Sequence, residues 1–171
     1  MFLRVLTLAG GLTGAAGLSQ FPEFSQQYVQ RLGGAVDELS RFVDEFDADA
    51  AGLGLSRAAA LADLEAGGAM GAARADTMGR VIARHARLSE DLQVLEAAGP
   101  FTRLHRVGHL GDAEIAAKVW QAYRPALPLT FEGVVFAGAG FLGGLAAVGG
   151  LGGIVRRLAG RRKAASAARA A

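Results

Sequence analysis

The feature that most constrains this chain is a long uncharged segment toward its C-terminal end. Residues 133–155 contain no Asp, Glu, Lys or Arg. As a helix with a rise of 1.5 Å per residue, this segment is about 35 Å long, which is enough to cross the roughly 30 Å hydrocarbon core of a bilayer. We therefore expect a membrane protein with a transmembrane helix over residues 129–155 and a basic tail over residues 156–171.

A second uncharged segment begins directly after Arg4. It predicts either a transmembrane helix over residues 2–19, with Arg4 reaching back to the interface, or a cleavable signal peptide with its cleavage site near residues 15–17. The segment is short for a membrane span and long for the apolar core of a signal peptide. We favour the retained helix because small residues recur four apart in it, at Gly10 and Gly14 among others, as helix packing in lipid prefers.

The C-terminal segment is rich in glycine, with nine among residues 133–155. Glycine is tolerated in lipid-embedded helices and lets two helix axes approach closely. Gly-x-x-x-Gly pairs arise by chance in so glycine-rich a segment, but we expect this face to pack against the first helix or against another protein. The helix-packing candidates are Gly10, Gly14, Gly140, Gly144, Gly149 and Gly153.

The charges predict the orientation in the membrane. Residues 20–128 carry 11 Lys and Arg against 15 Asp and Glu, whereas residues 156–171 carry six basic residues and no acidic ones. Since basic residues flanking a span stay in the cytoplasm, both termini are predicted to be cytoplasmic and residues 20–128 periplasmic, in a bacterial inner membrane. The basic pI reflects the short tail, so we expect no nucleic-acid binding. The topology determinants are Arg4, Arg156, Arg157, Arg161, Arg162 and Lys163.

The middle of the chain predicts amphipathic helices and no strand. Pro22 is placed to begin a helix, and apolar residues then recur at spacings of four and three as far as Phe46, which is typical of a coiled coil. Gly33 and Gly34 should weaken or bend this helix. A second helix with the same period follows and stops at Gly99-Pro100. Together they predict an antiparallel helical hairpin.

Two capping residues predict further helices in this region. Ser56 is placed to cap a short helix that ends near Glu65 and connects the two long ones. Asp112 is placed to cap a last helix that ends near Tyr123. Trp120 and Tyr123 then precede the second apolar segment, where amphipathic aromatic side chains favour the headgroup region. A salt bridge between Asp37 and Arg41, four residues apart, is expected on the first long helix.

Two runs of this chain resemble a known family. The first is Gln20-Phe-Pro-Glu-Phe-Ser-Gln-Gln-Tyr-Val-Gln-Arg-Leu-Gly-Gly-Ala-Val-Asp-Glu-Leu39, and the second is Pro128-Leu-Thr-Phe-Glu-Gly133. They are similar to an uncharacterised family of small proteobacterial inner-membrane proteins. The resemblance implies a bacterial membrane protein with a helical insert. Because that family has no assigned activity, the resemblance transfers no functional residue.

One motif points toward a nucleotide cofactor. Gly138-Ala-Gly140-Phe-Leu-Gly143 matches the dinucleotide fingerprint G-x-G-x-x-G. That fingerprint works at the start of a βαβ unit, with an acidic residue about 20 positions later to bind the ribose. No Asp or Glu follows Glu132. A glycine-rich membrane helix explains the same residues, and we expect no cofactor.

Metal binding and catalysis receive little support. His105 and His109 are four apart and near Asp112, but no third ligand is indicated. Asp47 and Asp49 begin like a calcium loop whose later ligand positions are alanine. The absence of cysteine excludes disulfides, thiolate zinc sites and a cysteine nucleophile. We expect no catalytic residue and no metal site.

The predicted fold is an all-α membrane protein, in which N- and C-terminal transmembrane helices bracket a coiled-coil-like helical hairpin. The leading functional hypothesis is a non-enzymatic interaction subunit or self-associating scaffold, with the bilayer and a protein partner or second copy as partners and no small-molecule substrate. A small oligomeric channel or transporter component is the alternative. It needs polar residues facing a pore, and within the uncharged centres of the spans, residues 5–18 and 133–155, only Thr7 and Thr13 are polar. A membrane-anchored enzyme is the third hypothesis.

Overall fold

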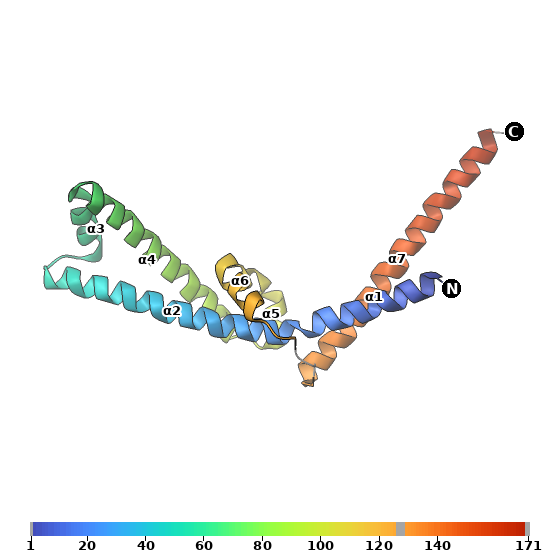
Figure 1. Ribbon diagram of the computed structural model, residues 1–171, viewed down its shortest axis with the longest axis horizontal. Coiled ribbons are helices and arrows are strands. Elements are labelled where there is room, and N and C mark those ends of the chain that lie inside the picture. The colour runs from blue at the N-terminus through green and yellow to red at the C-terminus, as the bar shows by residue number, and fades with distance from the viewer. Residues whose placement is uncertain (1, 126–128, 170–171) are drawn as a thin grey trace. The chain divides into compact units, whose positions relative to one another are not determined.

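The computed structural model describes the backbone over residues 2–125 and 129–169, with side chains over 3–125 and 129–157. Every regular element in these ranges is helical, and they contain no strand, so the predicted all-α class is confirmed for this part of the chain (Figure 1). The helices are α1 (Phe2–Ser19), α2 (Phe21–Gly52), α3 (Arg57–Ala66), α4 (Gly68–Glu96), α5 (Pro100–His105), the 3₁₀ helix η1 (Val107–Leu110), α6 (Ala113–Ala122) and α7 (Phe131–Arg169).

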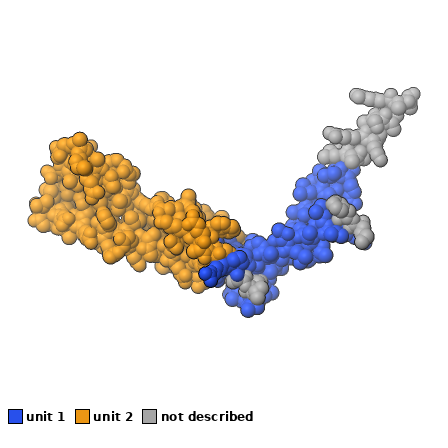
Figure 2. Space-filling view, viewed as in Figure 1, with its two compact units in different colours: residues 1–24, 124–171 blue, residues 25–123 orange. Residues whose placement is uncertain are grey.

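The chain forms two compact units (Figure 2). The first combines residues 1–24 with residues 124–171, so it contains α1 and α7. The second is residues 25–123, which contain most of α2 and all of α3 to α6. The boundary predicted at residue 128 lies outside the described residues.

Both predicted capping residues begin helices. The Ser56 hydroxyl accepts the Ala59 N–H at 3.2 Å at the start of α3. The Asp112 carboxylate accepts the Ile115 N–H at 3.1 Å at the start of α6. Each bond satisfies a backbone donor that has no partner within the first helical turn. The local sequence signal was therefore sufficient to locate the starts of these two helices.

One local expectation for α2 needs correction. The helix is continuous through Gly33 and Gly34, and the weakening or bend expected at these glycines stays a prediction. The expected salt bridge from Asp37 to Arg41 is wrong, since Arg41 pairs with Glu38 instead. Both partners lie on the same exposed face, and spacings of three and four are equally accessible there.

The core of the second unit lies where α4 returns along α2. A Cβ built at Gly33 of α2 would lie 4.0 Å from a Leu92 methyl of α4, so the two helices are in contact. α6 adds Ile115 and Val119 to the same core. The largest fully buried side chains are Tyr28, Leu32, Leu88 and Leu95. Each buried leucine contributes about 1.5–3 kcal/mol to folding, so these side chains are a large part of the apolar support of the unit.

A buried polar cluster joins three helices beside this core. The Tyr28 hydroxyl of α2 accepts the backbone N–H of Asp112 at 3.0 Å. The Asp112 side chain, in a residue only 5% exposed, binds Arg84 Nη2 at 3.1 Å and Arg87 Nη2 at 3.3 Å, both from α4. The Asp112 carboxylate also caps α6, so Asp112 connects α4 and α6 through its side chain and α2 through its backbone N–H. Removing the carboxylate leaves the N–H of the buried Ile115 without its capping partner, which is the costly case.

The surroundings shift the pKa of both Asp112 and Tyr28. Burial acts to raise the pKa of Asp112, but the Ile115 N–H and the positive charges of Arg84 and Arg87 outweigh it, and the net pKa is lower than usual. Burial raises the pKa of Tyr28, and the negative charge of Asp112 adds to this effect. At neutral pH the cluster therefore contains an ionised aspartate and a neutral tyrosine.

The lowered pKa of Asp112 predicts a loss of stability in acid. Because the carboxyl binds protons less readily in the folded chain than in the unfolded chain, its contribution is complete above the unfolded pKa of about 3.9 and disappears as pH falls through the folded value. Asp112→Asn keeps an amide oxygen for capping but loses the charge. We expect Asp112→Asn to lower the free energy of unfolding by about 1–3 kcal/mol at pH 7. Below pH 4 the free energy of unfolding should depend less on pH in this variant than in the wild type.

Urea unfolding of the full chain in detergent micelles, followed by circular dichroism from pH 3 to 7, measures this effect. Asp47→Asn is the matched control, because its carboxylate pairs with Arg57 on the exposed surface, where solvent weakens ion pairs. Equal losses in the two variants would contradict the role given to Asp112.

Candidate helix-packing interface and apolar pocket

The first unit is held together by direct backbone contact between α1 and α7. A Cβ built at Gly140 would overlap the Gly14 carbonyl and lie 2.7 Å from its carbon. A Cβ built at Gly144 would likewise lie 2.7 Å from the carbonyl carbon of Gly10. Any side chain at these positions would push the helices apart, so glycine is required by the close approach.

The six glycines proposed from sequence separate into two groups. Gly10, Gly14, Gly140 and Gly144 lie in the contact between the helices. A Cβ at Gly149 would only touch the Thr7 methyl at 3.9 Å, and one at Gly153 would meet nothing within 4 Å. The second Gly-x-x-x-Gly pair of α7 therefore lies beside the contact.

Two glycines of the contact were missed from sequence. A Cβ at Gly11 would lie 2.8 Å from the Phe141 ring, and one at Gly152 would lie 2.7 Å from a Leu3 methyl. The spacing of four that links Gly140 to Gly144 continues through Val148 to Gly152. This spacing was the sequence signal that could have identified Gly152 as part of the contact. Val148 follows the same face, since its side chain meets Gly10.

An aromatic pair and two local hydrogen bonds accompany this interface. Phe21 and Phe136 have ring centroids 5.5 Å apart, and Phe136 is buried. The Thr7 hydroxyl donates to the Leu3 carbonyl at 2.8 Å within α1. Thr130 accepts the Gly133 N–H at 3.1 Å and so caps the start of α7. Each of these hydroxyls therefore has a hydrogen-bond partner on the backbone.

One helix in the described residues is long and apolar enough to cross a membrane, over Phe131–Arg157. Only 11% of the 18-residue apolar stretch of this helix is buried, whereas a core helix of a soluble protein is mostly buried. Large apolar side chains such as Leu142 and Leu151 are accordingly about two-thirds exposed. A single helix of this kind supports a membrane location only weakly. The second span expected over residues 2–19 coincides with α1, but length and hydropathy do not establish α1 as a span.

The basic residues that were assigned to orientation are exposed where their side chains are described. Arg4, Arg156 and Arg157 all face outward, and Arg156 Nε donates to the Gly152 carbonyl at 3.3 Å. The side chains of Arg161, Arg162 and Lys163 lie outside the described part of the chain.

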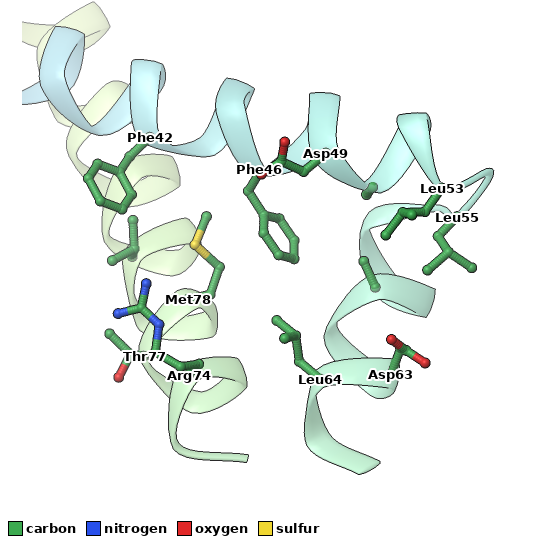
Figure 3. Close-up of a pocket in the computed structure, with 13 residues that line it drawn as sticks. Phe42, Phe46, Asp49, Leu53, Leu55, Asp63, Leu64, Arg74, Thr77 and Met78 are labelled. Carbon is green, nitrogen blue, oxygen red and sulfur yellow. The ribbon is translucent and has the colours of Figure 1, made fainter. Parts of the chain in front are cut away.

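An apolar pocket of about 310 Å³ lies between α2, α3 and α4 in the second unit. Figure 3 shows Phe46, Leu64 and Met78 pointing toward one another from these three helices. Phe42 and Leu53 line the same space and are 51% and 75% exposed. Large apolar side chains are thus both inside the pocket and at its opening.

Charged side chains surround this pocket unevenly. Asp49, Asp63 and Arg74 lie at its edge, and none of them has an ion-pair partner among the described residues. Arg57 Nε donates to Asp47 at 2.7 Å across the loop from α2 to α3, and this hydrogen bond lowers the pKa of Asp47 and raises that of Arg57. The loop is therefore tied down, while the two pocket aspartates stay available.

The histidines do not converge on one site. His109 Nδ1 lies 2.7 Å from Asp91 Oδ1 of α4, whereas His105 Nδ1 lies 3.4 Å from the Phe101 carbonyl of its own helix. His85 is partly buried on α4. Within the described residues no group of three or more His, Asp or Glu side chains is placed to hold a metal ion.

The glycines of the nucleotide fingerprint lie inside α7. Gly138 and Gly143 have nothing within 4 Å of a built Cβ, and Gly140 is occupied by the contact with Gly14. The run begins within the helix, whereas a dinucleotide fingerprint lies between a strand and a helix. The second glycine of the motif, Gly140, is therefore explained by helix packing.

The sequence profile of one family, described as "Protein of unknown function (DUF2937)", matches residues 2–161. Because the match spans nearly the whole chain, the chain belongs to this family. No curated protein and no solved structure matches the chain significantly.

The contact between Gly14 and Gly140 predicts a sharp difference between two glycine-to-alanine variants. Gly140→Ala should separate α1 from α7, because its methyl would overlap the Gly14 carbonyl, whereas Gly138→Ala points into open space. The chain has no cysteine, so Thr7→Cys with Gly149→Cys introduces a single reporter pair across the interface. We expect the disulfide yield in native membranes to fall several-fold in Gly140→Ala and to stay unchanged in Gly138→Ala. Equal yields would show that the glycine contact is not required.

Proposed function

We propose that this chain is a non-enzymatic membrane protein in which α1 and α7 form an anchor and the second unit binds another protein. The observation that carries the proposal is the open apolar pocket between α2, α3 and α4, with Phe42 and Leu53 exposed at its opening. A pocket of this volume, with mostly apolar side chains and a few charged groups, is typical of binding sites.

The anchor is supported by the way α1 and α7 expose their apolar side chains. Their glycines face each other, while Leu8 and Leu12 of α1 and Leu142 and Ile154 of α7 are about half or more exposed. In water this arrangement leaves much apolar surface uncovered, whereas lipid covers it at no cost. We propose that both helices lie in a bacterial inner membrane.

The orientation follows from the charged residues that flank these helices. Arg4 lies near the start of α1, and Arg156 and Arg157 follow the apolar part of α7. The positive-inside rule then places both ends of the chain in the cytoplasm and residues 20–128 in the periplasm.

The charges near the pocket indicate the chemistry of the partner. Residues 37–65 carry eight Asp and Glu against two Arg, and the pocket edge contributes the unpaired Asp49 and Asp63. A partner segment with large apolar side chains and flanking Lys or Arg matches both properties. We propose a helix of this composition from a different protein, and a second copy of this chain is the competing occupant.

Site-specific photocrosslinking in living cells tests the proposed pocket. A photoreactive phenylalanine at Phe42, which is 51% exposed and lines the pocket, should give an adduct with a distinct protein. Phe101, which is 41% exposed and outside the pocket, is the matched control and should give none. Asp63→Lys should lower the yield at Phe42 because it reverses one of the charges that favour a basic partner.

The mass of the adduct separates the outcomes. An adduct with twice the mass of the chain would show that the occupant is a second copy of this chain and not a different protein. No adduct at Phe42, or equal adducts at Phe42 and Phe101, would contradict an interaction site in this pocket.

Reporter fusions test the proposed orientation. Alkaline phosphatase, which is active only after export, should be active when fused near residue 60, and a fluorescent protein that folds only in the cytoplasm should be dark there. The reverse pair of results would place the second unit in the cytoplasm and overturn the topology.

A further inference from the structure

A second apolar hollow lies in the first unit, between the first turns of α1 and the later part of α7. Its volume is about 540 Å³, within the range of roughly 300–1,000 Å³ that small-molecule sites occupy. Its lining is Leu3, Leu6, Val148, Leu151, Gly152, Val155 and Arg156. We call it the α1–α7 groove.

The walls of the α1–α7 groove are almost entirely hydrocarbon. Leu6, Leu151 and Val155 are 47%, 63% and 64% exposed, so their apolar surfaces are not covered by the chain itself. The missing side chain at Gly152 lets Leu3 approach α7 closely, which closes one side of the groove. An apolar chain lying in the groove would cover these surfaces.

The charge in the groove is supplied by Arg156. Its Nε donates to the Gly152 carbonyl at 3.3 Å, which holds the guanidinium against the helix that lines the groove. The two terminal nitrogens have no carboxylate partner among the described side chains. A guanidinium in this position offers paired N–H donors to a phosphate.

We propose that the α1–α7 groove binds one acyl chain of an anionic phospholipid whose phosphate lies at Arg156. Charge complementarity selects this occupant, because the groove combines an apolar wall with a positive charge and contains no acidic residue. The inference rests on the proposed membrane anchor formed by α1 and α7. It differs from general attraction of a basic tail to the membrane surface, since it assigns the contact to one arginine and one groove.

The test uses the full chain reconstituted in nanodiscs of phosphatidylcholine with phosphatidylglycerol, released for native mass spectrometry. The wild-type protein should retain phosphatidylglycerol in preference to phosphatidylcholine. Arg156→Gln should lower that preference about tenfold or more, the loss expected for one charge-assisted hydrogen bond to a phosphate. Arg157→Gln is the matched control, because Arg157 is also exposed and adjacent but does not line the groove. Equal effects of the two substitutions would overturn the site.

A second pair of variants tests the groove itself. Leu151→Trp fills the groove and should reduce the amount of retained phosphatidylglycerol severalfold. Leu142→Trp is its control, since Leu142 is 66% exposed on the same helix but lies outside the groove. Unchanged retention in Leu151→Trp, or a co-purifying polypeptide that Leu151→Trp displaces, would exclude lipid as the occupant.

Carbonate extraction of native membranes separates failure of this site from failure of the anchor. If the wild-type chain resists extraction but retains both lipids equally, the lipid site is wrong and the anchor stands. If carbonate releases the chain, the proposed anchor is wrong and the lipid site is overturned with it.

Discussion

The contact of glycine backbones between α1 and α7 is the interaction on which the first unit depends. Dispersion forces between atoms are individually small and fall steeply with separation, so two helices in lipid gain from packing only when they approach closely. Gly14 and Gly140 allow that approach because neither carries a Cβ. The same geometry leaves leucines such as Leu12 and Leu142 exposed, and it leaves the α1–α7 groove beside the contact.

The second unit has one closed end and one open end along α2. Near Tyr28 the buried Asp112 joins three helices, with its carboxylate bound to α4 and α6 and its backbone N–H bound to the Tyr28 hydroxyl of α2. Phe46 lies 18 residues further on, about 27 Å along the helix, where the three lining helices leave a pocket.

Much of the helical architecture followed from short-range signals. Ser56 and Asp112 were recognisable as caps because capping needs only a side-chain oxygen two or three residues before its donor. The predicted partner of Arg41 was wrong because several carboxylates on one exposed helix face give ion pairs of nearly equal energy. The choice between Gly149 and Gly152 failed for a different reason, since both glycines suit a membrane helix and only the position of α1 distinguishes them.

The sequence by itself determined the helical class, the apolar lengths near both ends, the caps and the absence of cysteine chemistry, because each depends on residues close together in the chain. The tertiary structure alone decided which glycines touch, where the pocket lies and that Tyr28 meets Asp112, 84 residues away. These features depend on the register between distant helices. Register is set by the packing of many side chains at once, and local periodicity does not encode it.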